Sequence, residues 1–514
     1  MQTQVLIIGA GATGTGIFRD LALRGVECML IEQRDVNAGA SGGNHGLLHS
    51  GARYVSTDPH SANECKVEGD IIKEFAPHCI ENTGGLFVAV KGDDEEYINQ
   101  FPINCEKAGV PCREVSPEEA LELEPNLNPD VIAAYEVEDA SIDPFKLSLE
   151  NVADAEAHGG VYKRYMKLLG FKKEGGKITG ARVVNTRTGK ESVIEAEQYV
   201  NATGAWAANV AEMAGANIRM TYAKGSLLVT LSRLNHRVIN RLRPPGDGDI
   251  LVPGGTVSVL GTTSVRVEDL DNVAPSIDEI NRNIDQGAQM VPVLDTCRYV
   301  RAYAGVRPLV QLGDASSDRA ASRGYALLSH EEENLENFIT ITGGKLTTYR
   351  LMAERCADLV CNRLKVDAPC LTRGTVLPDY VQTEWAEPSI LTKREWMRRH
   401  NSEDYLLCEC EIVPKSAVDT ILDSFGEGEK PGIQAVGLRS RVGKGSCQGA
   451  FCGARIAAHM YDRDLFKGNE GVESMRDFLS KRWKGQRPIL WDAQFNQAEL
   501  KEALYFGLLN LEMD

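Results

Sequence analysis

The chain has 514 residues, of which 43% are hydrophobic and 25% charged, as in ordinary globular proteins with two or three domains. Its 73 acidic residues outnumber the 56 basic ones, and the net charge of −17 argues against an extended nucleic-acid surface. The sequence contains no run of about 18 apolar residues, so we expect no membrane-spanning helix.

The N-terminus leads directly into an apolar run, without a basic leader or a cleavage site, and we expect a cytoplasmic location. Thirteen cysteines in such a chain indicate a reducing compartment, where clustered cysteines bind metal more often than they form disulfides. Nine of the thirteen lack a ligand spacing, and we expect these to be ordinary core or surface thiols.

A dinucleotide-binding fingerprint opens the chain. Residues 4–8 form a short apolar run typical of a buried parallel strand, and the glycines of Gly9-x-Gly11-x-Thr13-Gly14 follow it. Gly9 permits a tight turn, Gly11 lets the backbone approach a pyrophosphate, and Gly14 lets the helix pack closely on the strand. Free N–H groups at the start of such a helix favour the phosphates.

The sequence after the glycines fits the same pattern. We expect a helix to begin near Gly14 and a second strand to span residues 27–32. Glu32, which ends that strand, is placed to accept hydrogen bonds from the adenosine ribose. The fingerprint alone does not distinguish FAD from NAD.

Three later segments indicate which dinucleotide binds. Residues 39–54 read Gly-Ala-Ser-Gly-Gly-Asn-His-Gly-Leu-Leu-His-Ser-Gly-Ala-Arg-Tyr, residues 200–206 read Val-Asn-Ala-Thr-Gly-Ala-Trp, and residues 338–350 read Phe-Ile-Thr-Ile-Thr-Gly-Gly-Lys-Leu-Thr-Thr-Tyr-Arg. Their order resembles the D-amino-acid-oxidase-like superfamily of FAD oxidoreductases, which implies FAD as the cofactor. In that superfamily the third segment turns into a helix aimed at the flavin ring, and a positive helix end there would stabilise the anionic reduced flavin. Beyond the fingerprint, the resemblance assigns FAD contacts to Ser41, His45, Gly46, Leu47, Ala202, Gly204, Gly343, Gly344, Lys345, Leu346 and Thr347.

Basic residues close to these segments predict a phosphate pocket. The runs 48–54, 304–309, 343–350, 224–226 and 261–263 are similar to segments of the FAD-dependent glycerol-3-phosphate dehydrogenases. In that family the positions of Arg53, Arg307 and Lys345, with a later arginine that corresponds to Arg323, surround the substrate phosphate or the flavin edge. The chemistry agrees, because forked guanidinium donors match the oxygens of a phosphate monoester.

One position departs from the family. Single-subunit members carry a histidine directly after Lys-Gly-Ser, near the reacting carbon, whereas this chain has Leu227. The base that takes the C2 hydroxyl proton therefore stays open among His49, His45 and Lys345, the last only if desolvation lowers its pKa. Some relatives attach FAD covalently through a histidine in this region, which here would be His45 or His49.

Four cysteines near the C-terminus have a ligand spacing: Cys408-x-Cys410 and Cys447-x4-Cys452. Four thiolates suit either zinc or an iron–sulfur cluster. Structural zinc sites more often use two CxxC knuckles, and this spacing resembles the bacterioferritin-associated-ferredoxin-like [2Fe–2S] domain, in the version fused to flavin dehydrogenases.

The resemblance covers nearly the whole chain, which is similar to the family of A subunits of bacterial anaerobic glycerol-3-phosphate dehydrogenases. It implies oxidation of sn-glycerol 3-phosphate to dihydroxyacetone phosphate, with hydride moving from C2 to flavin N5. It also implies a second flavoprotein subunit linked with FMN, a membrane-anchored iron–sulfur subunit that holds the complex at the cytoplasmic membrane, and quinone as a later electron acceptor.

Two other functions remain open. FAD-dependent amino-acid or amine dehydrogenases of the proline and glycine types also carry this cysteine domain, and they would bind a carboxylate that a single arginine could hold. A non-catalytic electron-transfer subunit would bind FAD and no substrate. The paired Arg307 and Lys345 motifs, together with Arg53, favour phosphate over carboxylate.

We predict an α/β protein with a Rossmann-type FAD-binding domain, an inserted antiparallel-sheet substrate domain and a small C-terminal helical [2Fe–2S]-binding domain. The expected FAD-dependent oxidoreductase domain spans residues 1–371, with the substrate-domain strands within about 80–140 and 220–330. A linker (372–405), the ferredoxin-like domain (406–460) and a helical segment (461–514) follow.

Overall fold

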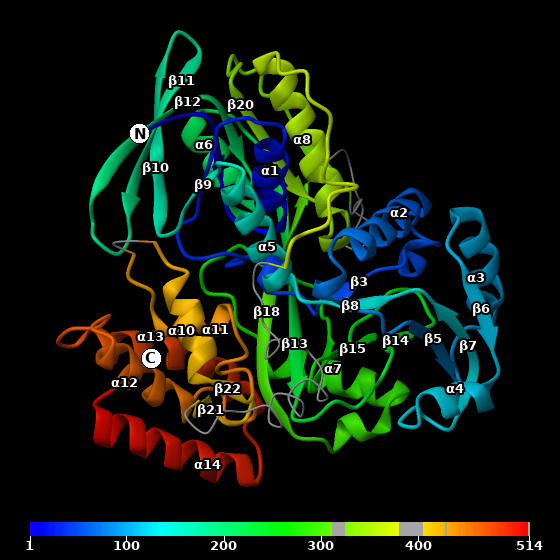
Figure 1. Ribbon diagram of the computed structural model, residues 1–514. Helices are drawn as coiled ribbons and strands as arrows, with labels where there is room; N and C mark the ends of the chain where they lie inside the picture. The colour runs from blue at the N-terminus through cyan, green and yellow to red at the C-terminus, as the bar shows by residue number, and fades with distance from the viewer. Residues whose placement is uncertain (311–323, 380–403, 427–428, 512–514) are drawn as a thin grey trace.

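The computed structural model describes residues 1–310, 324–379, 404–426 and 429–511 (Figure 1). Its first layer is a sheet around β1 (Gln2–Ile8), which runs parallel to β2 (Cys28–Ile31) on one side and β12 (Glu191–Asn201) on the other. β9 (Val161–Lys163) and β20 (Phe338–Gly343) extend the parallel part. Three antiparallel strands complete this sheet: β10 (Met166–Glu174), β11 (Lys177–Asn185) and β19 (Tyr325–Leu328).

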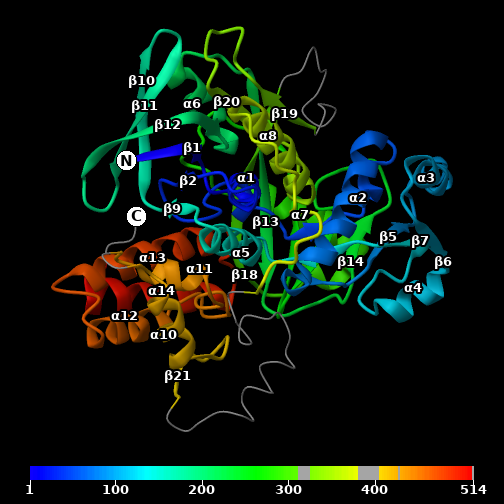
Figure 2. The same cartoon turned by 45° about the horizontal axis from the view of Figure 1, so that its top comes forward.

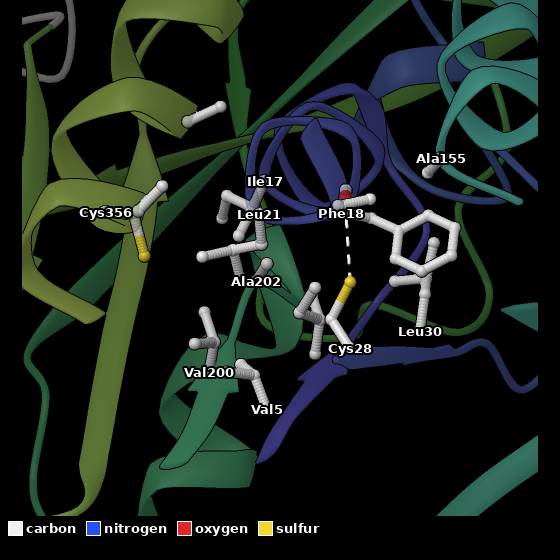
Figure 3. Close-up of a cluster of buried hydrophobic side chains, with 14 of the residues drawn as sticks. Val5, Ile17, Phe18, Leu21, Cys28, Leu30, Ala155, Val200, Ala202 and Cys356 are labelled. Carbon is white, nitrogen blue, oxygen red and sulfur yellow. Dashed lines mark hydrogen bonds between the residues drawn. The ribbon is translucent and has the colours of Figure 1, made fainter. Parts of the chain in front are cut away.

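Helices cover both faces of this sheet. Successive side chains of a strand point to opposite faces, and those of β1 are apolar on both. Val5 and Ile7 pack against α1 (Ala12–Leu23). Two further helices pack against the same core, α5 (Pro144–Ala157) and α8 (Tyr349–Leu364). Figure 3 shows part of this core, in which the Cys28 thiol donates to the backbone oxygen of Phe18 at 3.6 Å. Leu6 and Ile8 point to the other face, where they meet α6 (Ala207–Ala214).

Helix α1 begins two residues before the predicted position. β1 ends at Ile8, and the turn is complete by Gly11, which is the N-cap residue of a helix that starts at Ala12. Gly11 has no side chain that could cap this N-terminus, but the Ser41 hydroxyl accepts a hydrogen bond from the backbone N–H of Ala12 at 3.0 Å.

The second layer is a nine-stranded sheet formed by two separate parts of the chain. β13 (Met220–Thr230) and β18 (Tyr299–Val310) make the longest antiparallel pair in it. β14 (Val238–Arg241) pairs in parallel with β5 (Gly85–Val90), so one pair departs from the antiparallel arrangement that we expected. The other strands are β6 (Cys112–Val115), β7 (Val131–Val137), β15 (Ile250–Gly254), β16 (Val257–Gly261) and β17 (Val265–Arg266).

Shorter elements surround this sheet. A small antiparallel sheet has β8 (Ala140–Ile142) at its centre, paired with β3 (Leu47–Leu48) on one side and β4 (Ile80–Glu81) on the other. β3 lies in the predicted flavin segment. The helices of this part of the chain are α2 (Pro59–Phe75), α3 (Glu95–Ala108), α4 (Pro117–Leu123) and α7 (Ile277–Met290).

The C-terminal part forms a helical unit with a hydrophobic core of its own, centred on the fully buried Phe478. Its short strands β21 (Leu406–Cys408) and β22 (Val413–Pro414) precede a set of helices: α10 (Lys415–Asp423), α11 (Ile433–Leu438), α12 (Cys452–Asp462), α13 (Glu470–Gln486) and α14 (Ala493–Glu502). A π-helical segment, Ala503–Leu508, follows α14.

This unit is docked on both sheets (Figure 2). Helix α13 contacts β18, and the following Ile489 joins the core of the second sheet. On the side of the first sheet, Arg439 forms an ion pair with Asp35 at 2.9 Å, and both side chains are less than a tenth exposed. The Phe425 ring is contacted by the guanidinium groups of Arg164 and Arg439, at 4.3 and 4.9 Å.

We expect the Arg439–Asp35 pair to hold the two units together. Burial alone would raise the pKa of Asp35, but the adjacent Arg439 holds it below its usual value. Replacing Arg439 with Met leaves the carboxylate buried and unpaired, and this should cost about 3–5 kcal/mol. Limited proteolysis should then release the C-terminal unit at lower denaturant concentrations than in the wild type.

The matched control is Lys430→Met, because Lys430 pairs with Glu470 at 2.6 Å but is 68% exposed and should contribute little. Asp35→Asn combined with Arg439→Met should recover part of the loss. An Arg439→Met protein as resistant as the wild type would contradict this account.

Among the described helices, none has the length and apolar character needed to cross a membrane.

Candidate active site

A large cavity, of about 750 Å³, lies where the two sheets meet. Most of the predicted site residues line it: Gly9, Gly11, Thr13, Glu32, Ser41, His45, Leu47, His49, Arg53, Ala202, Gly204, Arg307, Gly343, Gly344, Lys345 and Leu346. Three predicted residues do not line the cavity: Gly14, Gly46 and Thr347. Arg323, the fourth predicted basic residue, lies outside the described residues.

The turn between β1 and α1 forms one end of the cavity. Gly9 has a φ of 105°, and a Cβ there would lie 2.7 Å from the backbone oxygen of Ala202. A Cβ on Gly14 would lie 1.9 Å from the backbone oxygen of Gly9, so only glycine lets helix and strand approach this closely. Gly11, Ala12 and Thr13, at the N-terminus of α1, line the cavity, and the N–H groups of a helix start suit a pyrophosphate. The N–H of Ala12 already donates to the Ser41 hydroxyl at 3.0 Å.

Glu32 lies beside this turn, at the end of β2. Its carboxylate accepts hydrogen bonds from the backbone N–H groups of Ala10, at 3.0 Å, and Arg34, at 2.9 Å. These bonds fix the orientation of the carboxylate, while burial raises its pKa. Glu32 also lines the cavity, as a residue that binds a ribose must.

The turn after β20 forms another part of the cavity wall. Gly343 and Gly344 have φ values of 87° and 71°, and the chain then enters η6 (Leu346–Thr348) and α8. The Thr347 hydroxyl accepts a hydrogen bond from the backbone N–H of His49 at 3.2 Å. This bond joins two of the predicted flavin segments, although Thr347 itself does not line the cavity.

Three of the predicted cationic residues line the cavity and come from different elements, and Arg34 and Lys167 line it as well. Arg53 comes from η2 (Ala52–Tyr54), Arg307 from β18, and Lys345 from the residue before η6. The Lys345 ammonium lies 4.8 Å from the centre of the Tyr54 ring, which is a cation–π contact. Three positive groups around one cavity, in a chain of net charge −17, suit a dianionic ligand.

Residues that the sequence analysis did not select hold two of these cations in place. Arg53 pairs at 3.3 Å with Asp249, whose carboxylate also receives Arg243 at 2.6 Å. Arg307 donates to the backbone oxygen of Thr263 at 3.1 Å and to the hydroxyl of Thr262. The sequence analysis noted the run 261–263 only for its similarity to the family, and it predicted neither the threonine contacts nor the pairing with Asp249.

The two histidines of the flavin segment have different surroundings. His49 Nε2 lies 3.5 Å from the Tyr54 hydroxyl. The pKa of His45 is lowered to about 3 by burial and by the charges of Arg307 and Arg53. Leu227 is only 1% exposed, sits in β13 opposite Gly261, and does not line the cavity.

The four predicted ligand cysteines converge in the C-terminal unit. Cys408 ends β21, Cys452 begins α12, and the sulfurs of Cys410 and Cys447 are 3.3 Å apart. Each thiol interacts with two others around a ring, and this sharing of protons lowers the pKa of Cys408 and Cys447 while it raises that of the other two. Such a donor set fits a bound metal centre.

The ring is open rather than tetrahedral. Among the described residues, the only trio of His, Cys, Asp or Glu ligand atoms within 4.8 Å of one another is His78, Glu150 and Asp379, so no three of the four sulfurs are that close. Arg482 lies next to the ring, where it donates to the backbone oxygen of Gly443 at 2.9 Å. Burial lowers its pKa to about 9, and no sequence motif pointed to this residue.

The fold and the cavity define a FAD-dependent oxidoreductase, and comparison with known proteins agrees. The family model described as "FAD dependent oxidoreductase" matches residues 4–359. The chain is 40% identical to the A subunits of the anaerobic glycerol-3-phosphate dehydrogenases of Escherichia coli strains K12 and O157:H7, over 100% of this chain and 98% of each relative. The chain therefore belongs to the family of anaerobic glycerol-3-phosphate dehydrogenase A subunits.

Solved structures support the fold. The glycerol-3-phosphate dehydrogenase of Bacillus halodurans, complexed with FAD, aligns over 96% of both chains with a TM-score of 0.66 and 20% identity. The L-proline dehydrogenase of P. horikoshii aligns over 77% of this chain and 98% of its own, with a TM-score of 0.58 and 22% identity. The predicted α/β FAD-binding fold with a second sheet and a helical C-terminal part is confirmed.

Proposed function

We propose that this chain catalyses the FAD-dependent oxidation of sn-glycerol 3-phosphate to dihydroxyacetone phosphate. The observation that carries the proposal is the convergence of Arg53, Arg307 and Lys345 on the cavity that begins at the dinucleotide fingerprint. The relatives from Escherichia coli, which are named as parts of a glycerol-3-phosphate dehydrogenase, match this chain over its full length and support the same substrate.

The residues of the chain divide the work between two ends of the cavity. Gly9, Gly11 and the start of α1 hold the pyrophosphate of FAD, and Glu32 holds its adenosine ribose. Bound FAD supplies the two-electron acceptor, which no side chain can provide. Arg53 and Arg307 bind the substrate phosphate and thereby orient the C2 carbon toward the flavin.

The turn after β20 contributes charge stabilisation. Lys345 and the N–H groups at the start of η6 and α8 place positive potential at the flavin end of the cavity. That potential favours the negative charge that develops when FAD accepts a hydride. The other predicted FAD contacts, Ser41, Leu47, Ala202 and Gly204, supply shape rather than charge.

The rival function is oxidation of an amino acid or amine. A carboxylate carries a single negative charge, and one arginine suffices to hold it, whereas Arg53, Arg307 and Lys345 together line this cavity. Turnover with an artificial electron-accepting dye separates the functions. We expect sn-glycerol 3-phosphate to be oxidised, and L-proline and glycine not. Oxidation of proline or glycine alone would establish the rival, and a FAD-loaded chain inert to all three would indicate an electron-transfer subunit.

We further propose that electrons leave through a [2Fe–2S] cluster held by Cys408, Cys410, Cys447 and Cys452. A tetrahedral zinc site, with Zn–S bonds of about 2.3 Å, needs all four sulfurs about 3.8 Å apart. An open ring suits two metal ions side by side better. The buried Arg482 would offset the cluster's negative charge.

We also propose an assembly around this chain. It contains a second flavoprotein subunit, which is linked with FMN, and a membrane-anchored iron–sulfur subunit. Quinone receives the electrons indirectly, and the chain lies at the inner face of the cell membrane through these subunits. The relatives are named as A subunits, which supports a complex of several subunits. The division into 1–371, 372–405, 406–460 and 461–514 stays a proposal.

A further inference from the structure

His45 and His49 lie in the same short segment and both line the cavity, with ring centres 6.1 Å apart. Their partners differ. His49 has the Tyr54 hydroxyl near its Nε2. The Nδ1 atom of His45 is buried and has no hydrogen-bond partner among the described residues. Because Nδ1 is buried while the residue lines the cavity, Nε2 is the ring nitrogen that can contact a ligand.

A histidine that acts as a base usually has a carboxylate or carbonyl group behind it, which raises its basicity. His45 lacks such a group at Nδ1 among the residues that the structure describes. The charges that act on its ring are instead positive. Burial lowers the pKa of His45, and the charges of Arg307 and Arg53 lower it further, to about 3. Without substrate, His45 is therefore a neutral and weak proton acceptor at any physiological pH.

The other charged residues that line the cavity are Glu32, Arg34, Lys167, Asp271 and Lys345, and none of them contributes to the shift in the pKa of His45. Asp249 has its carboxylate paired with Arg53 and Arg243. A bound phosphate dianion would place two negative charges against Arg53 and Arg307, and would reverse the field at His45.

We propose that His45 accepts the proton of the substrate's C2 hydroxyl, and that the substrate's own phosphate enables it to do so by pairing with Arg53 and Arg307. This inference rests on the proposed function. The O–H bond breaks and its proton moves to Nε2 of His45. The oxygen's electron pair forms the C2=O bond as the C2–H electron pair leaves with its hydrogen as hydride to FAD. The alcohol is oxidised, FAD is reduced, and the imidazolium retains the proton.

The arrangement has a consequence for specificity. A diol without phosphate would leave the positive field of both arginines acting on His45, which then cannot take a proton. The site therefore selects phosphorylated substrates by reaction rate as well as by binding. It also accounts for Leu227, since the proton acceptor comes from the flavin segment rather than from β13.

The first test measures the protonation of His45 directly in the FAD-loaded protein, by NMR of ring-labelled histidines. The His45→Gln variant identifies the His45 signal, and His60→Gln is the matched control, because the His60 side chain is 85% exposed. We expect the signal to stay neutral down to about pH 5, and its midpoint to rise by at least about one pH unit with saturating inorganic phosphate. An identical titration with and without phosphate would overturn the proposal.

The second test uses turnover. In His45→Gln, kcat for sn-glycerol 3-phosphate, normalised to FAD content, should fall about 100-fold or more with KM little changed, since the arginines still hold the phosphate. Inorganic phosphite should accelerate the oxidation of ethane-1,2-diol, the substrate without its phosphate arm, by the wild type and not by His45→Gln. His60→Gln should behave as the wild type does.

These outcomes separate the two proposals. If the wild type does not oxidise sn-glycerol 3-phosphate, the proposed function fails. The role of phosphate is then refuted separately, if the NMR titration of His45 is the same with and without phosphate. If the wild type does oxidise it and His45→Gln retains kcat, only the role of His45 is refuted. A phosphite response that is lost in His49→Gln but retained in His45→Gln would also refute it.

Discussion

Replacing both Arg53 and Arg307 with Met should lower kcat/KM for sn-glycerol 3-phosphate by about 10²- to 10⁴-fold. Each guanidinium donates charge-assisted hydrogen bonds to the substrate phosphate, which contribute about 1.5–3 kcal/mol apiece. Loss of both removes about 3–6 kcal/mol of transition-state stabilisation, which is the stated factor in rate. Steady-state kinetics with an artificial acceptor, together with flavin content, measure the effect.

The fold and the flavin should survive this change. Asp249 keeps its ion pair with Arg243, so no buried carboxylate is left alone. The nucleotide end of the cavity, built on the turn between β1 and α1, is not touched. Arg113→Met is the matched control, because Arg113 is 55% exposed and lies in β6. If the double variant oxidises sn-glycerol 3-phosphate at the wild-type rate, the phosphate pocket is elsewhere.

Replacing Cys410 and Cys447 with Ser should remove the metal centre and leave the chemistry at the flavin intact. This pair, with sulfurs 3.3 Å apart, is less buried than Cys408 and Cys452, so the core of the C-terminal unit should tolerate the change. We expect iron to fall from about two atoms per chain to background, because a [2Fe–2S] cluster needs four thiolates. Substrate should still reduce the flavin, while transfer from the flavin to one-electron acceptors should stop.

Metal analysis and visible spectra of anaerobically purified protein measure this outcome. Cys112→Ser is the control, since Cys112 lies in β6, is partly exposed, and belongs to none of the ligand pairs. One zinc ion per chain in the wild type would contradict the cluster. Unchanged electron transfer to one-electron acceptors after loss of the iron would contradict its role as the exit path.

Local motifs allowed much of the site to be predicted. The fingerprint at Gly9, Gly11 and Gly14 predicts a strand, a turn and a helix within a few residues, and these elements form as expected apart from the earlier start of α1. The predicted flavin segments lie together around the cavity because several of them follow strands of one sheet. Physical constraints of this kind act over short stretches and can be recognised in the sequence.

Contacts between distant segments were not predictable in the same way. The Arg53–Asp249 pair and the parallel pairing of β14 with β5 depend on how the second sheet assembles from two parts of the chain. Arg439 and Asp35 are 404 positions apart, and charged residues at such separations carry no sign of their partner. The position of Arg482 beside the cysteines depends likewise on how α13 packs.

The most direct test of the proposed function is anaerobic stopped-flow absorbance of the FAD-loaded chain mixed with sn-glycerol 3-phosphate. We expect rapid bleaching of the flavin's visible band in a single turnover, with one dihydroxyacetone phosphate formed per flavin, and no bleaching with L-proline or glycine. A flavin that sn-glycerol 3-phosphate leaves oxidised, in a protein that proline or glycine reduces, would contradict it.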